Sequence, residues 1–309
     1  MRTGIIGAGK VGCSLGKYFR LNDLEVTGYY DVNENLAKEA ADFTATAFIK
    51  DLDTIVKESD TLFLTVPDDL ITIVWNQIKD MSLEGKFICH CSGALSSGDA
   101  FPGIDKCGAF GYSVHPLFAV SDKYNSYKEL SHAYFVIEGD ERHREDVAGI
   151  FRNLGNEVCY IAAEDKVKYH CAAAVCSNHV VALIQESLNL MQECGFDEEG
   201  ALKALAPIML GNMQHIVENG TVNSLTGPVE RADVKTVEKH LNCLNKSQQM
   251  LYCLLSEILI SIGEKKNPER DYGKLKDILD NKQYCNIDEQ QIRRGINEEH
   301  SNNFSGNER

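Results

Sequence analysis

The stretch Gly4-Ile5-Ile6-Gly7-Ala8-Gly9-Lys10-Val11-Gly12 decides the fold, because a short apolar run ends in spaced glycines and helix-forming residues follow at once. We expect Gly7 to permit a tight turn from strand to helix, Gly9 to leave room for a pyrophosphate, and Gly12 to let helix and strand pack closely. The N–H groups of the first helical turn would face the phosphate. The sequence therefore predicts a dinucleotide site built from Gly7, Ala8, Gly9, Lys10, Val11 and Gly12.

A second apparent strand, residues 25–30, ends in an acid at the expected place. Asp31 follows Gly12 by 19 residues. An acidic side chain at this position accepts hydrogen bonds from an adenosine ribose and repels a 2′-phosphate. We therefore predict that the cofactor is NAD, with NADP as the alternative. The plainer interpretation, that the glycines only turn the chain, leaves the order of strand, glycines, helix, strand and acid unexplained.

Length and composition favour a two-domain globular protein. The 309 residues are 43% hydrophobic and 25% charged, and no unbroken apolar run reaches the roughly 18 residues of a membrane helix. Because the N-terminus starts directly with a strand, we expect no targeting segment and a cytoplasmic location. The net charge of −15 disfavours nucleic-acid and membrane partners and leaves small molecules as the expected ligands.

The cysteine pattern favours a reducing compartment and no metal. The 11 cysteines are scattered rather than set in a regular framework. Cys89-His90-Cys91 resembles a metal motif, but His90 would point opposite to the two cysteines in a strand, and no second ligand pair has zinc-like spacing. We predict no metal site.

Strands and helices alternate through the first half of the chain. Residues 60–66 form a continuous apolar run before Pro67, as a buried parallel strand does, and another strand ends at Cys91. This alternation predicts an α/β fold with a doubly wound, mostly parallel sheet. Ligands bind such sheets beyond the carboxyl ends of the strands. We therefore expect Thr65, Val66, Pro67 and Asp68 to border the cofactor, and we add Ser92 and Gly93 to the cofactor site.

Helical patterns replace the strands beyond about residue 163. We predict a dinucleotide domain over residues 1–163, an all-α substrate and dimerisation domain over 164–280, and a polar, flexible tail over 281–309. One helix should end at Gly195, and a second should run from Asp197 to Gly220 with a kink at Pro207. A third, long helix should start at Asp233 and continue to Gly263.

Proton-transfer candidates come from two segments that should face the substrate. His115 precedes a proline at the end of an apparent strand. Lys166, His170 and Ser177 would share one stripe of the first long helix, with Asn178 at its edge. Hydride transfer needs a proton donor, and histidine suits the task because its unperturbed pKa lies near neutrality. His115, His170 and Lys166 are the candidates, although each histidine could be structural and Lys166 could be a solvated residue at a helix start.

A third polar segment, residues 225–233, reads Leu-Thr-Gly-Pro-Val-Glu-Arg-Ala-Asp. Thr226 and the amides near Gly227 could hold an anion, and Arg231 could pair with a substrate carboxylate. The alternative is an interhelical turn in which Arg231 pairs with Glu230 or Asp233.

Together these segments resemble the Rossmann-like oxidoreductases that carry a C-terminal helical domain of unknown function. The broad group includes 3-hydroxyacid dehydrogenases, ketopantoate reductase and pyrroline-5-carboxylate reductase. The resemblance implies nicotinamide binding and a helix-mediated homodimer. Many members have serine or arginine where Asp31 stands, a pattern suited to NADP. This chain differs from them at that position, which supports NAD as its cofactor. The motifs that carry it are Gly7 to Gly12, Ser92-Gly93, His115-Pro116-Leu117, Tyr169 to Ala173, Ser177-Asn178 and Leu225 to Asp233.

The predicted function is hydride transfer between NAD(P) and a small carboxylate-bearing hydroxy acid, keto acid or imine. His170 or His115 would move the proton, Lys166 and Asn178 would position the reacting group, and Arg231 would hold the acid. A weaker similarity to prephenate and arogenate dehydrogenases rests on the His-Pro pair and the segment Ser177 to His179. A dinucleotide sensor without turnover is the alternative from another class.

Overall fold

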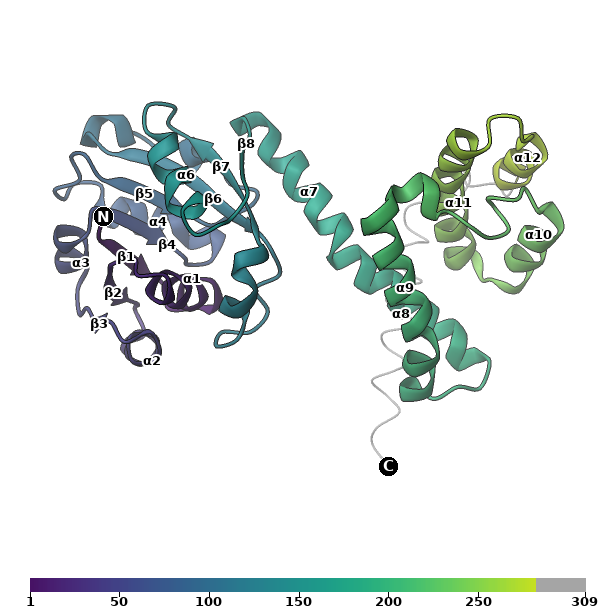
Figure 1. Cartoon of the computed structure of the whole chain (residues 1–309), viewed down its shortest axis with the longest axis horizontal. Helices are drawn as coiled ribbons and strands as arrows, with labels where there is room; N and C mark the ends of the chain where they lie inside the picture. Colours follow the sequence, from purple (N-terminus) through teal and green to yellow (C-terminus); the bar gives the residue numbers. More distant parts are fainter. Residues whose placement is uncertain (282–309) are drawn as a thin grey trace. The chain divides into compact units, whose positions relative to one another are not determined.

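The computed structural model describes residues 1–281 and divides the chain into two compact units. The first unit is Met1–Gln185, and the second begins at Glu186 (Figure 1). The first unit extends past the predicted boundary at residue 163, because Lys166 and Tyr169 of the following helix bind to residues of the sheet region. The predicted tail falls almost entirely outside the described residues.

The first unit contains one eight-stranded sheet in the order β3-β2-β1-β4-β5-β6-β7-β8. Strands β1 to β6 are parallel, β7 is antiparallel to β6, and β8 is parallel to β7. The predicted doubly wound, mostly parallel sheet is confirmed. The strand order reverses between β1 and β4, which is where such sheets bind ligands. The strands are β1 Thr3–Ile6, β2 Val26–Tyr30, β3 Ala47–Phe48, β4 Thr61–Leu64, β5 Phe87–His90, β6 Phe110–Leu117, β7 Tyr134–Gly139 and β8 Val158–Tyr160.

Helices of the first unit begin where side chains can cap them. Asn33 accepts a hydrogen bond from the N–H of Asn35 at the start of α2, and Asp51 accepts one from Thr54 at the start of α3. The α-helices are α1 Lys10–Leu21, α2 Glu34–Thr44, α3 Leu52–Glu58, α4 Asp68–Ile78, α5 Ser97–Ala100, α6 Arg144–Arg152 and α7 Lys166–Cys176, and the 3-10 helices are η1 Ile104–Cys107, η2 Ser126–His132 and η3 Ala163–Asp165.

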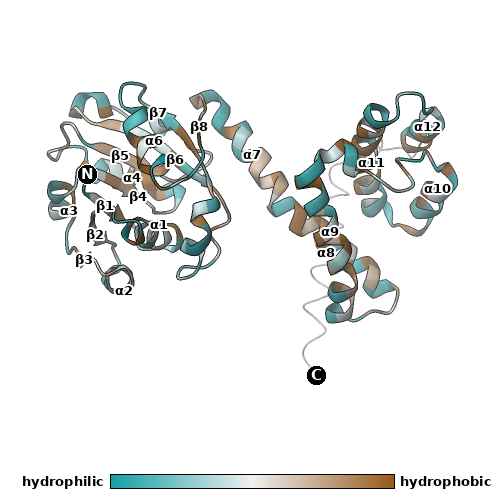
Figure 2. Ribbon diagram, viewed as in Figure 1, coloured by the Kyte–Doolittle hydropathy of each residue, from teal (hydrophilic) through white to brown (hydrophobic). Residues whose placement is uncertain are grey.

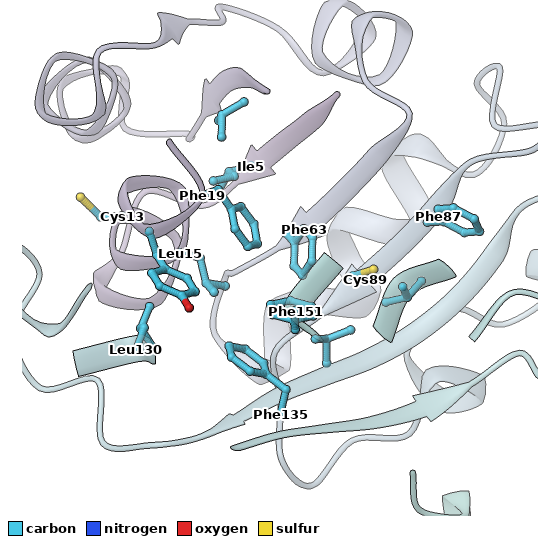
Figure 3. Packing of buried hydrophobic residues seen from close by; sticks show 14 of the residues in the cluster. Ile5, Cys13, Leu15, Phe19, Phe63, Phe87, Cys89, Leu130, Phe135 and Phe151 are labelled. Atoms are coloured by element: carbon cyan, nitrogen blue, oxygen red, sulfur yellow. The ribbon is translucent and has the colours of Figure 1, made fainter. Parts of the chain in front are cut away.

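The core lies on both faces of the sheet. All four residues of β4 are buried, and alternate side chains point to opposite faces. Phe63 packs with Phe19 and Phe151 on one face (Figure 3). Leu62 and Leu64 belong to a separate cluster around Trp75. This two-sided burial explains why the strand reads as one apolar run.

Strand β6 continues through His115 and Pro116, whereas the sequence predicted that the strand ends at His115, just before a turn at Pro116. Strand β5 ends opposite Ser113, so the residues of β6 beyond it pair with β7 alone. A proline, which lacks an N–H donor, is tolerated where a strand is paired on only one side. His115 is thereby part of the sheet rather than of a loop.

The second unit is helical, and two of the predicted helices differ from the structure. The predicted helix from Asp233 to Gly263 is two helices, because Asn245 starts a new one with a reciprocal capping box with Gln248. Within α9 the backbone leaves helical geometry at Gly220, whereas Pro207 lies inside the helix. The helices of this part are α8 Asn178–Glu193, which spans the boundary of the units, α9 Glu198–Ser224, α10 Val234–Cys243, α11 Lys246–Lys266 and α12 Gly273–Asn281.

Helix surfaces in this region carry much exposed apolar area. The relative exposure is 68% for Ile208, 72% for Leu210 and 85% for Val217 on α9, where Figure 2 shows brown, apolar residues among teal, polar ones. An 18-residue stretch within Ala163–Glu193 has a mean hydropathy of 1.2, which by length and composition alone is enough to cross a membrane. That is weak evidence for a span, because a single helix of a soluble protein can pass the same test.

Candidate functional site

The glycine-rich turn between β1 and α1 has two crowded positions and one open one. Gly7 has a φ of +108°, and a Cβ there would lie 2.8 Å from the carbonyl carbon of Thr65. A Cβ on Gly12 would lie 2.2 Å from the oxygen of Gly7 and 2.4 Å from Thr65 Oγ1. A Cβ on Gly9 would meet no atom within 4 Å. The turn thus needs Gly7 and Gly12 for its own packing, whereas Gly9 keeps an open space beside bare backbone.

Asp31 ties the end of β2 to this turn. Its Oδ2 accepts a hydrogen bond of 2.8 Å from the N–H of Ala8, and its Oδ1 accepts one of 2.8 Å from the N–H of Asn33. Each carboxylate oxygen can accept a second bond. Asp31 is therefore held beside the glycine turn with acceptor capacity left for a ribose hydroxyl.

The loop after β4 closes the other side of the turn. Thr65 Oγ1 donates to the carbonyl oxygen of Gly7 at 2.7 Å, so the two loops on either side of the strand-order reversal are joined. Val66 is half-buried and Pro67 is exposed. Lys10 is also exposed, at the first turn of α1. The predicted cofactor residues from Gly7 to Gly12, Asp31 and Thr65 to Pro67 thus lie at one edge of the sheet.

Two imidazoles meet over Gly93, in the loop after β5. A Cβ on Gly93 would lie 2.4 Å from Cδ2 of His170 and 3.0 Å from Nε2 of His115. The two rings are 6.1 Å apart between centroids, and His115 Nδ1 lies 2.7 Å from the hydroxyl of Tyr169. We call His115, Tyr169, His170 and Gly93 the imidazole cluster. The structure therefore brings together both predicted histidines and the predicted Ser92-Gly93 loop.

Lys166 lies next to the imidazole cluster and binds the Ser92 loop. Its side chain is buried, with 1% relative exposure, and Nζ donates to the carbonyl oxygen of Ser92 at 3.1 Å and to Ser113 Oγ at 2.5 Å. Ser113 Oγ in turn donates to the oxygen of Ser92 at 3.0 Å. Burial lowers the pKa of Lys166 to about 8, against the opposing charges of Glu138 and Asp68. Lys166 is thus a buried residue that fixes the Ser92 carbonyl, and the alternative of a solvated helix-start lysine is wrong.

The same surroundings keep the neighbouring histidines neutral near pH 7. Burial, followed by the charges of Lys166 and His170, lowers the pKa of His115 to about 4. Burial and Lys166 lower the pKa of His90 to about 3, and its Nδ1 accepts the N–H of Ser92. His90 thus helps to shape the Ser92 loop. His170, in contrast, is exposed to solvent.

Two predicted site residues lie outside the imidazole cluster. Helix α7 ends at Cys176, so the predicted polar stripe is interrupted before Asn178, whose Oδ1 accepts a hydrogen bond from Ser177 at 3.0 Å. Asn178 is eight residues beyond His170, or about 12 Å along a helix. Arg231 belongs to the second unit, where it is exposed.

The alternative ion pairs for Arg231 are not present among the described residues. Glu230 binds Arg270, with 2.6 Å between Oε1 and Nη1, and Asp233 caps α10 by accepting from Thr236. The segment from Thr226 to Asp233 therefore does form an interhelical turn, but its arginine is left without an ion-pair partner in the described part of the chain.

Two polar residues of this region were given no role from the sequence. Tyr169, named there only within a motif, binds His115, and Ser113 bridges Lys166 to Ser92. Asp68, which was expected to border the cofactor, accepts a 2.6 Å hydrogen bond from Ser92 Oγ. In the described residues, no group of three His, Cys, Asp or Glu side chains is close enough to bind a metal.

Two family models match the chain. Residues 1–116 match a Rossmann-like domain, and residues 133–258 match a domain of unknown function, DUF2520. This pairing confirms the resemblance inferred from the motifs. The chain combines a Rossmann-like domain with a C-terminal helical domain of unknown function.

Known proteins with this architecture share modest sequence identity with the chain. A Bacillus subtilis (strain 168) protein with the provisional name 6-phosphogluconate dehydrogenase YqeC is 24% identical over 205 residues, which cover 64% of this chain and 66% of that protein. The chain thus spans just under two thirds of this relative. Protein TM1727 from Thermotoga maritima is 28% identical with a TM-score of 0.67, covering 85% of this chain and 99% of its own. A provisionally named NADP oxidoreductase, BF3122 from Bacteroides fragilis, is 18% identical with a TM-score of 0.66, covering 84% and 98%.

Proposed function

Because this chain joins a Rossmann-like domain to a DUF2520 domain, we propose that it is an NAD(P)-dependent oxidoreductase. It transfers hydride between the nicotinamide and a small carboxylate-bearing hydroxy acid, keto acid or imine. The observation that carries the proposal is the glycine turn, where crowded Gly7 and Gly12 flank an open Gly9 and Asp31 is fixed alongside. The imidazole cluster at the end of β5 supplies the polar groups that such chemistry needs.

The residues of the turn have distinct tasks in binding. The open backbone at Gly9 and the free N–H groups at the start of α1 receive the pyrophosphate. Asp31 accepts hydrogen bonds from the adenosine ribose and disfavours a 2′-phosphate, so we propose that NAD is preferred over NADP. The name of BF3122 points to NADP in a structural relative, which makes this preference the part of the proposal most in need of a test.

The imidazole cluster provides proton transfer. The bound cofactor supplies or accepts the hydride but no acid or base. His115 and His170 lie on either side of Gly93, where either ring can reach an oxygen or nitrogen of a substrate. Lys166 holds the Ser92 carbonyl in place beneath them. Asn178 remains a proposed positioning residue, without support from a contact to the cluster.

We propose that Arg231 binds a carboxylate group of the substrate. Its guanidinium is exposed, and Arg270 rather than Arg231 binds the adjacent Glu230. Arg231 forms no ion pair within residues 1–281, although its charge helps to lower the pKa of Asp233. A guanidinium in this position suits bidentate binding of a carboxylate. The provisional name of the Bacillus relative also indicates a hydroxy acid with a carboxylate. A prephenate- or arogenate-type substrate would fit the same description.

A parallel titration of the purified protein with NADH and NADPH tests the cofactor. We expect NADH to bind more tightly, and Asp31→Ser to even out or reverse the preference. Gly9→Ala should weaken binding of both cofactors at least tenfold without loss of stability, since its methyl group enters open space. Gly149→Ala on α6 is the matched control, because its Cβ also meets no atom within 4 Å and α6 is not part of the glycine turn. If wild-type protein binds neither cofactor, the proposal fails.

Turnover distinguishes an enzyme from a dinucleotide sensor. A sensor would bind NADH and show no stereospecific hydride exchange with any of a panel of hydroxy acids, keto acids and imines. For an enzyme, the double variant His115→Ala and His170→Ala should lose most of its turnover while still binding NADH. Normal turnover by that variant would remove both histidines from the mechanism.

We further propose that the helical part forms a homodimer. Leu210, Met213 and Val217 share one stripe of α9, and their relative exposures are 72%, 48% and 85%. A second copy of the chain would cover this face. The mass in solution, measured by light scattering, should equal that of two chains, and Val217→Glu should shift it toward one. A single-chain mass for the wild type would refute the dimer.

A further inference from the structure

Tyr169 is the member of the imidazole cluster that has no assigned role. Its hydroxyl lies 2.7 Å from Nδ1 of His115, and the two rings meet edge to face at 83°. His115 is held in strand β6, and Tyr169 lies on the first turns of α7, next to His170. The contact therefore fixes an imidazole of the proposed site from a neighbouring element.

We propose that Tyr169 is a positioning residue that holds His115 as the tautomer with its proton on Nε2, so that His115 acts as a neutral hydrogen-bond donor to the substrate. This inference rests on the proposed function and deepens it. Proton transfer then belongs to His170, and His115 keeps its proton throughout the reaction.

The direction of the hydrogen bond follows from the acidities of the two groups. A phenol is a far stronger acid than the N–H of a neutral imidazole, so the phenol donates to the ring nitrogen. Burial raises the pKa of Tyr169 to about 12, so the hydroxyl keeps its proton near neutral pH. With Nδ1 as the acceptor, the one proton of the neutral ring must sit on Nε2.

Nε2 is also the nitrogen that faces the Ser92-Gly93 loop. It lies 3.0 Å from the point where a Cβ of Gly93 would be. The loop follows β5 at the carboxyl edge of the sheet, which is the ligand side of this fold. The donor proton is thus directed toward the part of the site where we place the reacting group.

The charges around His115 favour the neutral ring. Lys166, Tyr169 and His170 face it from α7, and His90 lies nearby at the end of β5. None of these groups is anionic near neutral pH, and the buried ammonium of Lys166 opposes a second positive charge. A ring that stays neutral cannot deliver a proton as an imidazolium, but it can polarise a carbonyl oxygen or imine nitrogen. His170, in contrast, is exposed to solvent.

Nitrogen-15 NMR of the histidine side chains tests the inference without cofactor or substrate. The His115 signals are assigned by their loss in His115→Gln. We expect an unprotonated Nδ1 and a protonated Nε2, unchanged between pH 8 and pH 5. In Tyr169→Phe the ring should populate both tautomers and become charged at a higher pH, because the bond that favoured the neutral form is gone.

Tyr252→Phe is a matched control from the second unit. Its hydroxyl lies 2.9 Å from Nδ1 of His240, so it is a second Tyr-His pair. Tyr252→Phe should alter the His240 signals and leave those of His115 unchanged. Melting curves of both variants verify that each still folds.

A proton on Nδ1 in the wild type, or an unchanged His115 signal in Tyr169→Phe, would overturn the inference. Failure of the proposed function gives a different result. In that case the protein does not bind NADH, although the NMR spectrum still shows the expected tautomer of His115. Once a substrate is known, Tyr169→Phe should lower kcat about tenfold or more and move the acid limb of the pH profile to higher pH. A change in KM alone would contradict a role in positioning His115.

Discussion

The glycine turn and the imidazole cluster both depend on a glycine, but for opposite reasons. Gly9 has open space where its side chain would be, whereas the corresponding space at Gly93 is taken by the rings of His115 and His170. At Gly9 the missing side chain leaves room for a ligand. At Gly93 it leaves room for the protein's own functional groups.

This difference shows which sites a sequence can reveal. The glycine turn consists of neighbouring residues, so its spacing can be recognised directly. The imidazole cluster combines residues from three distant elements, the β5 loop, β6 and α7. Three substitutions test whether the two regions depend on glycine and on packing in the ways described.

The largest effect is expected for Gly12→Ala. Alanine normally stabilises a helix by up to about 1 kcal/mol relative to glycine. Here the new Cβ would lie 2.2 Å from the carbonyl oxygen of Gly7, which is backbone held by Thr65. We expect the free energy of unfolding to fall by about 3 kcal/mol. Urea denaturation measures it, and an equal or raised stability would show that Gly12 is not required for packing.

An intermediate, pH-dependent effect is expected for Lys166→Met. The pKa of Lys166 is lowered by burial from an ordinary value of 10.5 to about 8. Between pH 8 and 10.5 the unfolded chain holds a proton that the folded chain lacks, so the free energy of unfolding of the wild type rises with pH. Below pH 8 the charged ammonium is buried at a constant cost.

The stability of the wild type relative to Lys166→Met should therefore increase by about 2 kcal/mol from pH 7 to pH 10. Urea denaturation of both proteins at both pH values measures this difference in the free energy of unfolding. The contributions of the other titrating groups cancel because both proteins contain them. Lys168→Met is the control, because Lys168 is exposed on the same helix. The same pH dependence in both variants would contradict a buried ammonium at position 166.

The smallest effect on stability is expected for Gly93→Ala. The new Cβ would lie 2.4 Å from Cδ2 of His170, but this side chain is exposed and can rotate away. It would also lie 3.0 Å from Nε2 of His115, a close contact that a shift of a few tenths of an ångström relieves. We expect a loss of about 1 kcal/mol or less, together with altered His170 signals in the NMR spectrum. A loss comparable to that of Gly12→Ala would mean that Gly93 is a packing position like the glycines of the turn.

Local patterns accounted for most of the fold. The apolar runs of β1 and β4 could be recognised directly, because each rests on neighbouring residues. The helix break before Asn245 was missed, because the apolar pattern continues across it. Its capping residues, Asn245 and Gln248, are nevertheless only three positions apart. The extension of β6 through Pro116 was also missed, because it depends on where β5 ends.

For the candidate site, residue types could be predicted and their surroundings could not. His115 and His170 were singled out by chemistry, but the hydrogen bond from Tyr169 depends on how α7 meets β6. Lys166 was chosen as a polar residue of a helix stripe, and its burial follows from Ser92 and Ser113 on other elements. Non-local contacts of this kind decide whether a lysine is solvated or buried.

The hydrogen bond between Asp31 and the N–H of Ala8 bears on any attempt to re-engineer the coenzyme. The Asp31 carboxylate that would bind the ribose also supports, through the N–H of Ala8, the glycine turn that would hold the pyrophosphate. A replacement chosen only to admit a 2′-phosphate also removes that support, so a shift of preference toward NADPH should come with weaker binding than the intact turn would allow. Asparagine in place of Asp31 keeps an oxygen acceptor for Ala8 while removing the negative charge, and is the better first step for a designer.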